Sequence, residues 1–447
     1  MITIIRFIKK LLKKPVVNKP VINAKYIIQR KDHKVSKTDI SDNAIKVLNK
    51  LNNAGFQAYL VGGSVRDLML QKAPKDFDIA TNATPTQIRN LFRNARIIGR
   101  RFKLAHIIYH REIIEVATFR GHEDADENHK TNDKGMLIRD NVYGTLEEDA
   151  WRRDFTINSL YYNIQDSSII DFTGGVSDVT QKHIRIIGQP DTRYQEDPVR
   201  MLRAIRFSAK LNFDISPETA NPIYEWNTLI THISGSRLFD EMTKLYQCGA
   251  AIKAHQLLVD FDLFKHLFAQ THLLLDSKKY PMKAFLTIAL ENTDKRISED
   301  KPVTPAFLFA VFLWFPFLAK VESLKNQGVD PLPAIDQAMS FVIKEQNNAV
   351  TIPKRYTQAI REIWMMQYRL PKRLGQRSYY LLQHPRFRAA YDFLVMRALV
   401  GDESVALADW WTTFQAVEDS KKEDMIAALA TSIPEKPKRR RQSLPPK

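Results

Sequence analysis

Cysteine and long apolar runs are almost missing from this sequence. Cys248 is the only cysteine among 447 residues, which excludes an internal disulfide framework and predicts a reducing, cytoplasmic location. No apolar run reaches the roughly 18 residues that a membrane-spanning helix needs. Residues 1–14 are apolar and basic but lack a small-residue cleavage site, so no secretory signal peptide is predicted. With 44% hydrophobic residues, a chain of this length predicts a folded protein of two to four domains.

Positive charge is concentrated in three parts of the chain. The 67 Lys and Arg residues outnumber the 50 Asp and Glu residues, which gives a net charge of +17. The net charge is +9 in residues 1–36, +8 in 351–400 and +5 in 431–447, whereas residues 401–430 carry −5. This segregation predicts a polyanionic partner, either RNA or an anionic membrane, with general solubility as the alternative. A helix formed by residues 1–14 could lie on a membrane surface, pack on the protein or stay disordered.

The pattern of expected strands and helices changes at about residue 195. Before it, short apolar strands alternate with helices; after it, helices separated by Pro-containing turns follow one another. The sequence therefore predicts an α+β protein, with an N-terminal α/β head followed by an all-helical neck and body. The expected segments are a basic tail (1–37), a head (38–175), a neck (176–250), a helical body (251–430) and a basic, disordered tail (431–447).

Local signals place the first elements of the head. Residues 57–61 and 76–80 are expected strands, with a glycine turn and a helix start between them. A Thr-Pro pair at residues 84–85 predicts another helix start, with Thr as N-cap and Pro as the first helical residue. Two further apolar segments, 104–109 and 113–119, predict a β-hairpin.

Asp76 and Asp78 provide the first chemical signal. Residues two apart on a strand project from the same face, so the two carboxylates would lie roughly 6–7 Å apart. Carboxylates at this separation repel each other unless a cation lies between them, and Mg²⁺ commonly binds one or two carboxylates together with substrate phosphates. Two such ions can activate an attacking hydroxyl group and stabilise departing pyrophosphate. Taken alone, an Asp-x-Asp pattern could equally be a pair of exposed strand acids.

Upstream of these acids, residues 60–67 combine a strand, a glycine turn and a helix start. Gly62 and Gly63 would let the backbone approach a phosphate group closely, and the helix N-terminus would supply free N–H groups. Arg66 could add a charge-assisted hydrogen bond to a triphosphate. The alternative is an ordinary strand–turn–helix with Arg66 on the surface. A phosphate cradle beside a carboxylate pair on the next strand favours a nucleotide-binding site.

Three blocks of sequence carry a family resemblance. The segment 60–78 resembles the head motif of the class II nucleotidyltransferases, the family of CCA-adding enzymes and bacterial poly(A) polymerases. Residues 152–158 (RRDFTIN) resemble the second motif of this family, and residues 196–207 (EDPVRMLRAIRF) resemble the motif that reads the incoming base. The blocks lie in the family's order and spacing over about residues 55–215. The resemblance implies a nucleotidyltransferase head that uses Mg²⁺.

The resemblance also implies roles for individual residues. Asp76 and Asp78 would be the metal ligands, and Asp154 would be the third catalytic acid. The implied nucleotide-binding residues are Gly62, Gly63 and Arg66 at the phosphates, Arg153 at the nucleotide, and Asp197, Arg200 and Arg203 near the base.

Several of these assignments have alternatives. Glu115, on a later strand, competes with Asp154 as the third carboxylate. Asp197 precedes a proline and could be the N-cap of the following helix, with or without a contact to the base. Arg200 and Arg203 could simply face solvent.

Four further blocks look like bacterial poly(A) polymerase sequence: residues 98–106, 141–145, 305–309 and 384–392. The function expected from this resemblance is template-independent addition of AMP from ATP to RNA 3′ ends, releasing pyrophosphate, in RNA processing and decay. The alternatives are a tRNA CCA-adding nucleotidyltransferase and, from another class, a non-catalytic RNA-binding adaptor that retains the head fold. Ser64 departs from the family pattern, in which a third glycine is common.

The basic region 351–400 interleaves aromatic residues with Lys and Arg. Cationic side chains with stacking rings suit the binding of single-stranded RNA without sequence preference. Alternatively, the rings form a helical core and the basic residues its solvent-exposed face. We expect most rings to lie in the core, with the basic face still touching RNA. The aromatic residues are Tyr356, Trp364, Tyr368, Tyr379, Tyr380, Phe387, Tyr391 and Phe393.

Overall fold

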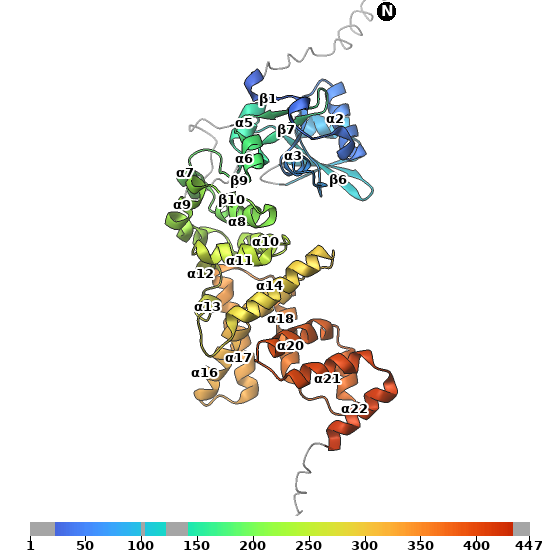
Figure 1. The fold of residues 1–447 in the computed structure, drawn as a ribbon, viewed down its shortest axis with the longest axis vertical. Helices are drawn as coiled ribbons and strands as arrows, with labels where there is room; N and C mark the ends of the chain where they lie inside the picture. The colour runs from blue at the N-terminus through green and yellow to red at the C-terminus, as the bar shows by residue number, and fades with distance from the viewer. Residues whose placement is uncertain (1–22, 100–102, 122–141, 432–447) are drawn as a thin grey trace, which may run out of the picture. The chain divides into compact units, whose positions relative to one another are not determined.

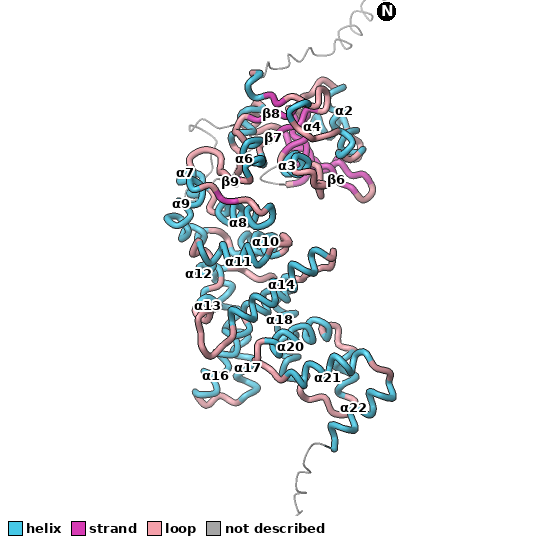
Figure 2. The backbone as a smooth tube through the Cα atoms, in the orientation of Figure 1, coloured by secondary structure: helices cyan, strands magenta, loops and turns pink. Residues whose placement is uncertain are grey.

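The computed structural model describes residues 23–99, 103–121 and 142–431. By internal contacts the chain divides into two compact units, residues 1–233 and 234–447. The first unit contains a mixed β-sheet with helices, and the described part of the second is helical, as the ribbon in Figure 1 and the tube in Figure 2 show. The expected α/β head followed by a helical body is therefore confirmed.

One eight-stranded sheet forms the centre of the first unit. Its strand order is β1-β8-β7-β2-β3-β6-β5-β4. The strands β3 and β6 pair in parallel, and the other neighbours pair antiparallel. The strands are β1 (Ile27–Ile28), β2 (Ala58–Val61), β3 (Asp78–Thr81), β4 (Ala95–Ile98), β5 (Leu104–Tyr109), β6 (Glu112–Thr118), β7 (Leu160–Asn163) and β8 (Ser168–Asp171).

The central strands follow the sequence signals closely. All four residues of β2 are buried, as expected for an apolar strand with neighbours on both sides. The predicted hairpin is β5 and β6, joined through His110, whose φ of 46° gives the tight turn. Strand β3 begins at Asp78, two residues later than predicted, because the first ladder pair with β2 joins Val61 to Asp78. Asp76 therefore lies in the turn before the strand.

Two helices of the first unit begin with capping boxes. Thr84 and Gln87 form a capping box at the start of α4, which confirms the predicted Thr-Pro start. Thr145 and Glu148 form a second capping box at the start of α5. The helices are α2 (Asp42–Asn53), α3 (Gly63–Met69), α4 (Pro85–Leu91), α5 (Leu146–Trp151), α6 (Gly175–Gln181), α7 (Pro190–Glu196), α8 (Val199–Leu211) and α9 (Pro217–Trp226), with 3₁₀ turns η1 (Ala24–Tyr26), η2 (Arg30–Asp32), η3 (Lys37–Asp39), η4 (Thr156–Asn158) and η5 (Asn227–His232).

Two short ladders differ from the sequence-based segments. The strand β1, placed in the basic tail 1–37 by the sequence, pairs with β8 and extends the sheet. The residue before β1, Tyr26, packs its ring on that of Phe172, with ring centroids 4.9 Å apart. The neck is also not entirely helical: β9 (His183–Ile184) pairs in parallel with β10 (Asp214–Ile215). The predictions for residues 1–14 lie outside the described residues.

The second unit consists of helices around an aromatic core. Trp314, Trp364 and Trp411 are fully buried in it, and the ring of Phe317 stacks on Trp364 at 4.7 Å. The helices are α10 (Gly235–Tyr246), α11 (Ala251–Asp260), α12 (Phe264–Leu267), α13 (Ala269–His272), α14 (Met282–Ser298), α15 (Pro305–Phe312), α16 (Trp314–Asn326), α17 (Pro331–Ala349), α18 (Lys354–Arg369), α19 (Arg377–Leu382), α20 (Phe387–Leu399), α21 (Val405–Ala416) and α22 (Asp419–Thr431).

No single helix among the described residues is long and apolar enough to cross a bilayer. Only the bent pair α15 and α16, at 48° to each other, meets the length and composition required. Most side chains of these two helices are buried within the second unit. A buried core explains their apolar sequence.

The helix α10 belongs to the second unit, although the sequence placed residues 176–250 in one neck segment. The backbone N–H of Thr351 donates to the carbonyl of Gly235 at 3.1 Å. A side chain at position 235 would overlap Thr351, because a Cβ there would lie 2.2 Å from its Oγ1. Close contact with the chain after α17 thus ties α10 to the body helices.

A buried histidine makes the stability of the second unit dependent on pH. Burial lowers the pKa of His255 to about 4; its ring meets Phe264 edge-on, and its Nδ1 lies 3.2 Å from the Tyr246 hydroxyl. Between pH 6.5 and about 4 the unfolded chain binds a proton at this histidine and the folded chain does not. The free energy of unfolding therefore has its full value above pH 6.5 and falls as the pH decreases towards 4. From pH 7 to pH 5 we expect a loss of about 2 kcal/mol in the free energy of unfolding.

Urea denaturation at both pH values measures this effect. In His255→Leu, the pH-dependent loss should shrink by most of that amount, because no titrating group is left at the site. The exposed His232 provides a matched control, and His232→Leu should leave the dependence unchanged. Equal pH dependence in His255→Leu and the unmodified protein would refute the assignment.

Candidate active site

Three carboxylates meet at the start of β3. Asp78 pairs with Val61 on one side and with Glu115 on the other, while Asp76 precedes it in the turn. Phe77 is buried between the two aspartates, Asp76 is exposed and Asp78 is half-buried. The apolar residue thus anchors the turn and leaves the acids outside the core.

The electrostatics of Asp78 indicate a need for a cation. Burial raises its pKa to about 6, and the nearby charges of Glu115 and Asp76 push it in the same direction, against Arg153. Ionising all of these acids together is unfavourable unless positive charge is added. Among the described residues, no three His, Cys, Asp or Glu side chains form a ready-made metal cluster. The acids instead suit a cation whose remaining ligands come from substrate phosphates and water.

The turn between β2 and α3 is built around Gly62. Its φ of 77° lies in the left-handed region that favours glycine, and its N–H donates to the carbonyl of Leu160 at 3.1 Å. Ser64, where the family commonly has glycine, is buried and donates its hydroxyl to the carbonyl of Val61 at 3.1 Å. The serine therefore closes the turn from inside. Gly63 starts α3.

Arg66 points inward and lies below this turn. The residue is only 3% exposed, and its guanidinium donates to Asn158 Oδ1 at 2.6 Å and to Asp67 Oδ1 at 2.9 and 2.7 Å. A Cβ at Gly63 would lie 3.4 Å from one of its nitrogens. In this structure Arg66 braces the turn against residue 158 and uses three of its five N–H groups in these hydrogen bonds.

Arg153 lies beside the glycine turn and is held by two partners that the sequence analysis missed. Its Nε and Nη2 donate to Asp149 Oδ2 at 3.2 and 2.9 Å, and its Nε also donates to the Tyr161 hydroxyl at 2.9 Å. The Tyr161 hydroxyl in turn donates to Asp149 at 2.7 Å. Nη1 of Arg153 would lie 3.6 Å from a Cβ at Gly62. Nε and Nη2 of the guanidinium are therefore held by hydrogen bonds, and Nη1 lies beside the glycine turn.

Asp154 is bound to an arginine rather than grouped with the three acids. Its Oδ2 accepts from Nε of Arg203 at 2.7 Å and from Nη2 of the same side chain, and its Oδ1 accepts from the N–H of Phe155 at 2.8 Å. Burial alone would raise the pKa of Asp154, but Arg203 and hydrogen bonds from Asn158 and Phe155 hold it below its usual range. Asp154 therefore joins the 152–158 segment to α8.

The residues expected near the base are also engaged by the protein. Oδ1 of Asp197 accepts from the N–H of Val199 at 3.3 Å, but the N-cap of α8 is Pro198, so Asp197 lies one residue before the predicted capping position. Nη1 of Arg200 donates to the carbonyl of Arg193 at 2.6 Å and to Glu196 at 2.9 Å. With side chains only 14% and 32% exposed, Arg200 and Arg203 do not simply face solvent.

Arginines gather beside the acids. Burial lowers the pKa of Arg152, and four other guanidinium groups, those of Arg120, Arg153, Arg193 and Arg200, lower it further. Such mutual repulsion among cations is relieved by a bound anion. The charge of Arg153 influences both Asp78 and Arg152, so the acidic and basic groups lie within electrostatic range of the same guanidinium.

Arg193 was not expected from the sequence. Its Nη2 donates to the carbonyls of Arg152 and Arg153 at 2.8 and 2.6 Å, which ties α7 to the 152–158 segment. Nothing in its local sequence marks this contact. The pairing of Asp149 with Arg153 could have been found, since the two residues are four apart at the end of α5.

Three family models match this chain. They are the poly A polymerase head domain at residues 58–185, the probable RNA and SrmB- binding site of polymerase A at 212–274, and the polymerase A arginine-rich C-terminus at 327–444. Together they cover both the sheet unit and much of the helical unit.

Curated proteins and solved structures agree with these matches. Poly(A) polymerase I of Salmonella typhi is 49% identical over 411 residues, which cover 90% of this chain and 88% of that protein. The Haemophilus influenzae protein of the same name is 46% identical and covers 93% of each chain. The CCA-adding enzyme of Bacillus subtilis is 36% identical but covers only 53% of this chain and 59% of that enzyme. The structure of Thermotoga maritima CCA-adding enzyme complexed with tRNA shares the fold, with a TM-score of 0.58, 20% identity and 86% of each chain covered.

Proposed function

The chain belongs to the bacterial poly(A) polymerase family, and from this premise we propose that it extends RNA 3′ ends with AMP units from ATP, without a template and with release of pyrophosphate. The family resemblance in the sequence is thereby confirmed. The proposed role is in RNA processing and decay in the cytoplasm, a location in keeping with the single cysteine.

The cluster of Asp78, Glu115 and Asp76 supports metal-dependent chemistry at this site. Its carboxylate is crowded by Glu115 and Asp76 and is offset by Arg153, whose Nη1 lies beside Gly62. Nucleotidyltransferase polymerases use divalent metal ions, and we propose that Asp76 and Asp78 hold Mg²⁺. The bound ions would polarise the α-phosphate and make the RNA 3′-hydroxyl a better nucleophile.

The protein's own side chains then have separable tasks. Asp76 and Asp78, at the start of β3, would hold the metal ions that align the two reacting oxygens. The arginines around Arg152 neutralise the triphosphate and departing pyrophosphate, which is where most of the rate in phosphoryl transfer arises. Gly62 and Gly63 would allow the backbone to approach the phosphates.

For the third carboxylate we propose Glu115 in place of Asp154. Glu115 lies opposite Asp78 in the parallel ladder, and its side chain is 45% exposed. Asp154 is instead neutralised by Arg203. Asp154 and Arg203 would then position the nucleotide site, together with Asp197 and Arg200.

Separate incubation of the purified protein with an unstructured RNA and each of the four nucleoside triphosphates tests the product. We expect long, heterogeneous tails with ATP, at least tenfold less incorporation of CTP, and no termination after three additions. A site that hydrogen-bonds one base edge leaves its polar groups unpaired with another base, which is the physical reason for the preference.

A truncated tRNA provides the discriminating substrate. If the protein adds two C residues and one A to it and then stops, the CCA-adding alternative is correct and the polymerase proposal is wrong. If no nucleotide is transferred to either RNA although both bind, the chain is an RNA-binding adaptor. The intact pair Asp76 and Asp78 argues against the adaptor.

A further inference from the structure

One aromatic ring in the basic region of the second unit differs from the rest. Of the eight aromatic residues in 351–400, four are buried and three are half-buried, which confirms the expectation that most rings belong to the core. Tyr380 is the exception, with 71% of its surface exposed. Large exposed rings are the feature with which proteins stack unpaired bases.

The short helix α19 holds this ring away from the core. Tyr379 packs on Phe414 with ring centroids 5.6 Å apart, and the buried Ser378 donates its hydroxyl to the carbonyl of Arg373 at 2.5 Å. These contacts anchor one side of α19, so the next residue, Tyr380, must project from another side. Among the described residues, no ring and no cation contacts the Tyr380 ring, whose faces are therefore open.

Three cations border the same ring. Arg369, Lys372, Arg377, Tyr380 and Leu381 line a shallow groove of about 350 Å³. All three cations are exposed, and none has an ion-pair partner in the part of the chain that the structure describes. No acid occurs in the sequence between Glu362 and Asp392, so the positive charge of the groove is not offset locally.

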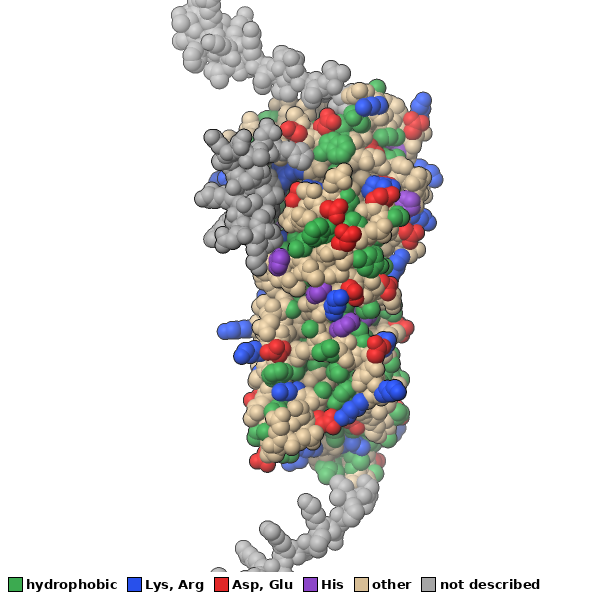
Figure 3. Space-filling model, turned by 90° about the vertical axis from the view of Figure 1, so that its left-hand side faces the viewer, with side chains coloured by type: hydrophobic (Ala, Val, Ile, Leu, Met, Phe, Trp, Pro, Cys, Tyr) green, Lys and Arg blue, Asp and Glu red, His purple; other side chains and the backbone are tan. Residues whose placement is uncertain are grey.

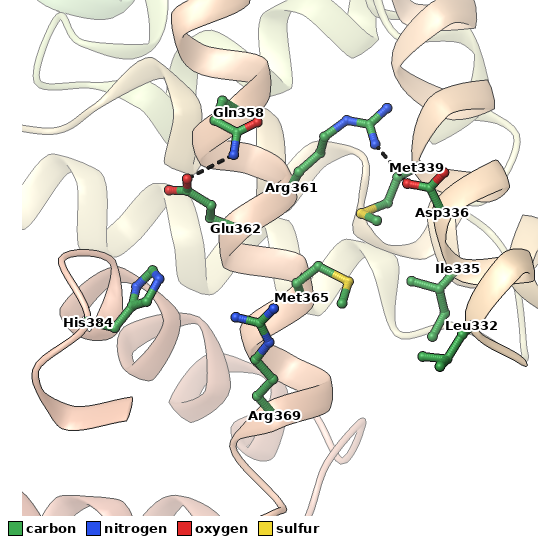
Figure 4. Close-up of a pocket in the computed structure, with 10 residues that line it drawn as sticks. All are labelled: Leu332, Ile335, Asp336, Met339, Gln358, Arg361, Glu362, Met365, Arg369 and His384. Atoms are coloured by element: carbon green, nitrogen blue, oxygen red, sulfur yellow. Dashed lines mark hydrogen bonds and ion pairs between the residues drawn. The ribbon is translucent and has the colours of Figure 1, made fainter. Parts of the chain in front are cut away.

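The neighbouring hollow has a different character, although it shares Arg369 with the groove. Figure 4 shows Arg361 paired with Asp336, and Gln358 donating to Glu362. The Glu362 carboxylate also pairs with Arg386 at 3.0 Å. No dashed contact reaches Arg369 in this view. The cation Arg361 in the hollow thus has an acidic partner, whereas the three cations of the groove have none among the described residues.

The face of the molecule drawn in Figure 3 shows no simple basic patch among the described residues. On the face seen in Figure 3, Lys and Arg side chains alternate with Asp and Glu over the described residues. A strong anion site therefore depends on cations without acidic partners, which the groove at Tyr380 provides.

We propose that this groove binds single-stranded RNA, with an unpaired base stacked on Tyr380 and the adjoining phosphates at Arg369, Lys372 and Arg377. The inference rests on the proposed function for the identity of the polyanion. An acidic peptide would satisfy the cations but would leave the open ring faces without a stacking partner. A duplex would offer phosphates but no unstacked base. The groove belongs to the second unit and contains none of the residues proposed to carry the chemistry, which lie in the first.

Fluorescence anisotropy of the full chain with a labelled, unstructured RNA tests the proposal in chelator and without ATP. We expect Tyr380→Ala to raise the Kd about tenfold, within the range for loss of one stacked base, and Tyr380→Phe to retain affinity. The combined change Arg369→Gln, Lys372→Gln and Arg377→Gln should flatten the slope of log K against log salt by about 2, at roughly 0.7 per phosphate contact. Binding of duplex RNA should be insensitive to Tyr380→Ala.

Phe341→Ala is the matched control for the ring. Phe341 is 42% exposed, but Nζ of Lys320 covers its ring at 4.1 Å, so this variant should bind RNA within about twofold of the unmodified protein. A Kd for Tyr380→Ala within the same twofold, or an equal loss on duplex RNA, would overturn the proposal. The proposal would also be overturned if an acidic peptide competed with RNA for the unmodified protein but not for Tyr380→Ala.

Enzyme assays separate this proposal from the proposed function. With a working polymerase, Tyr380→Ala should raise the KM for RNA in parallel with the Kd. If the unmodified protein transfers no nucleotide but its RNA affinity still depends on Tyr380, the polymerase function fails and the RNA groove stands.

Discussion

Replacing Asp78 with asparagine is expected to lower kcat for AMP addition about 1,000-fold, equivalent to about 4 kcal/mol of transition-state stabilisation. The substitution keeps the shape of the side chain but removes the charge that holds a divalent cation. RNA binding should survive, because it depends on cationic side chains elsewhere. Single-turnover kinetics at saturating ATP and RNA measure the loss in the chemical step directly.

The same substitution should raise stability, and this separates loss of function from loss of fold. In the ionised form Asp78 is disfavoured by burial and by Glu115 and Asp76, so a neutral amide should increase the free energy of unfolding by about 1–2 kcal/mol at pH 8 in chelator. Asp76→Asn should show a similar loss of kcat. The exposed Asp409, remote in sequence from the site, offers Asp409→Asn as a control with unchanged kcat and stability. Near-normal turnover by Asp78→Asn would disprove the metal mechanism.

The outline of the fold could be predicted because its signals are local. The Thr-Pro start of α4, the β5–β6 hairpin and the helix after Asp197 each depend on a few adjacent residues. The prediction of a carboxylate pair at Asp76 and Asp78 rests on an equally local pattern. The exact start of β3 could not be predicted in this way, because it depends on how the strand pairs with β2.

The partners of the site residues could not be predicted, because the fold brings them together from distant positions. Asp154 meets Arg203 across 49 residues, and Arg66 meets Asn158 across 92. A motif shows that such residues occur together, but it does not distinguish a side chain that touches substrate from one that holds the site in shape. That distinction requires burial and hydrogen-bond geometry, which place Arg66 inside the protein.

Asp154→Asn is therefore expected to lower the stability of the fold. The change removes the negative charge that pairs with the Arg203 guanidinium, whose side chain is 32% exposed. Breaking a well-buried pair costs about 3–5 kcal/mol, and the partial exposure of Arg203 reduces the expected loss in the free energy of unfolding to about 2–3 kcal/mol. Activity should fall as well, since the pair joins the 152–158 segment, including Arg153, to α8.

Glu115→Gln is the matched comparison, because it neutralises the other candidate for the third carboxylate. Glu115 crowds Asp78, so its loss should leave stability unchanged or higher while kcat falls about 100-fold. A double-mutant cycle then tests the brace: with Arg203→Gln present, adding Asp154→Asn should cost little further stability, because the pair is already broken. If Asp154→Asn instead abolishes kcat at unchanged stability, and Glu115→Gln is fully active, Asp154 is the third catalytic acid and Glu115 is not.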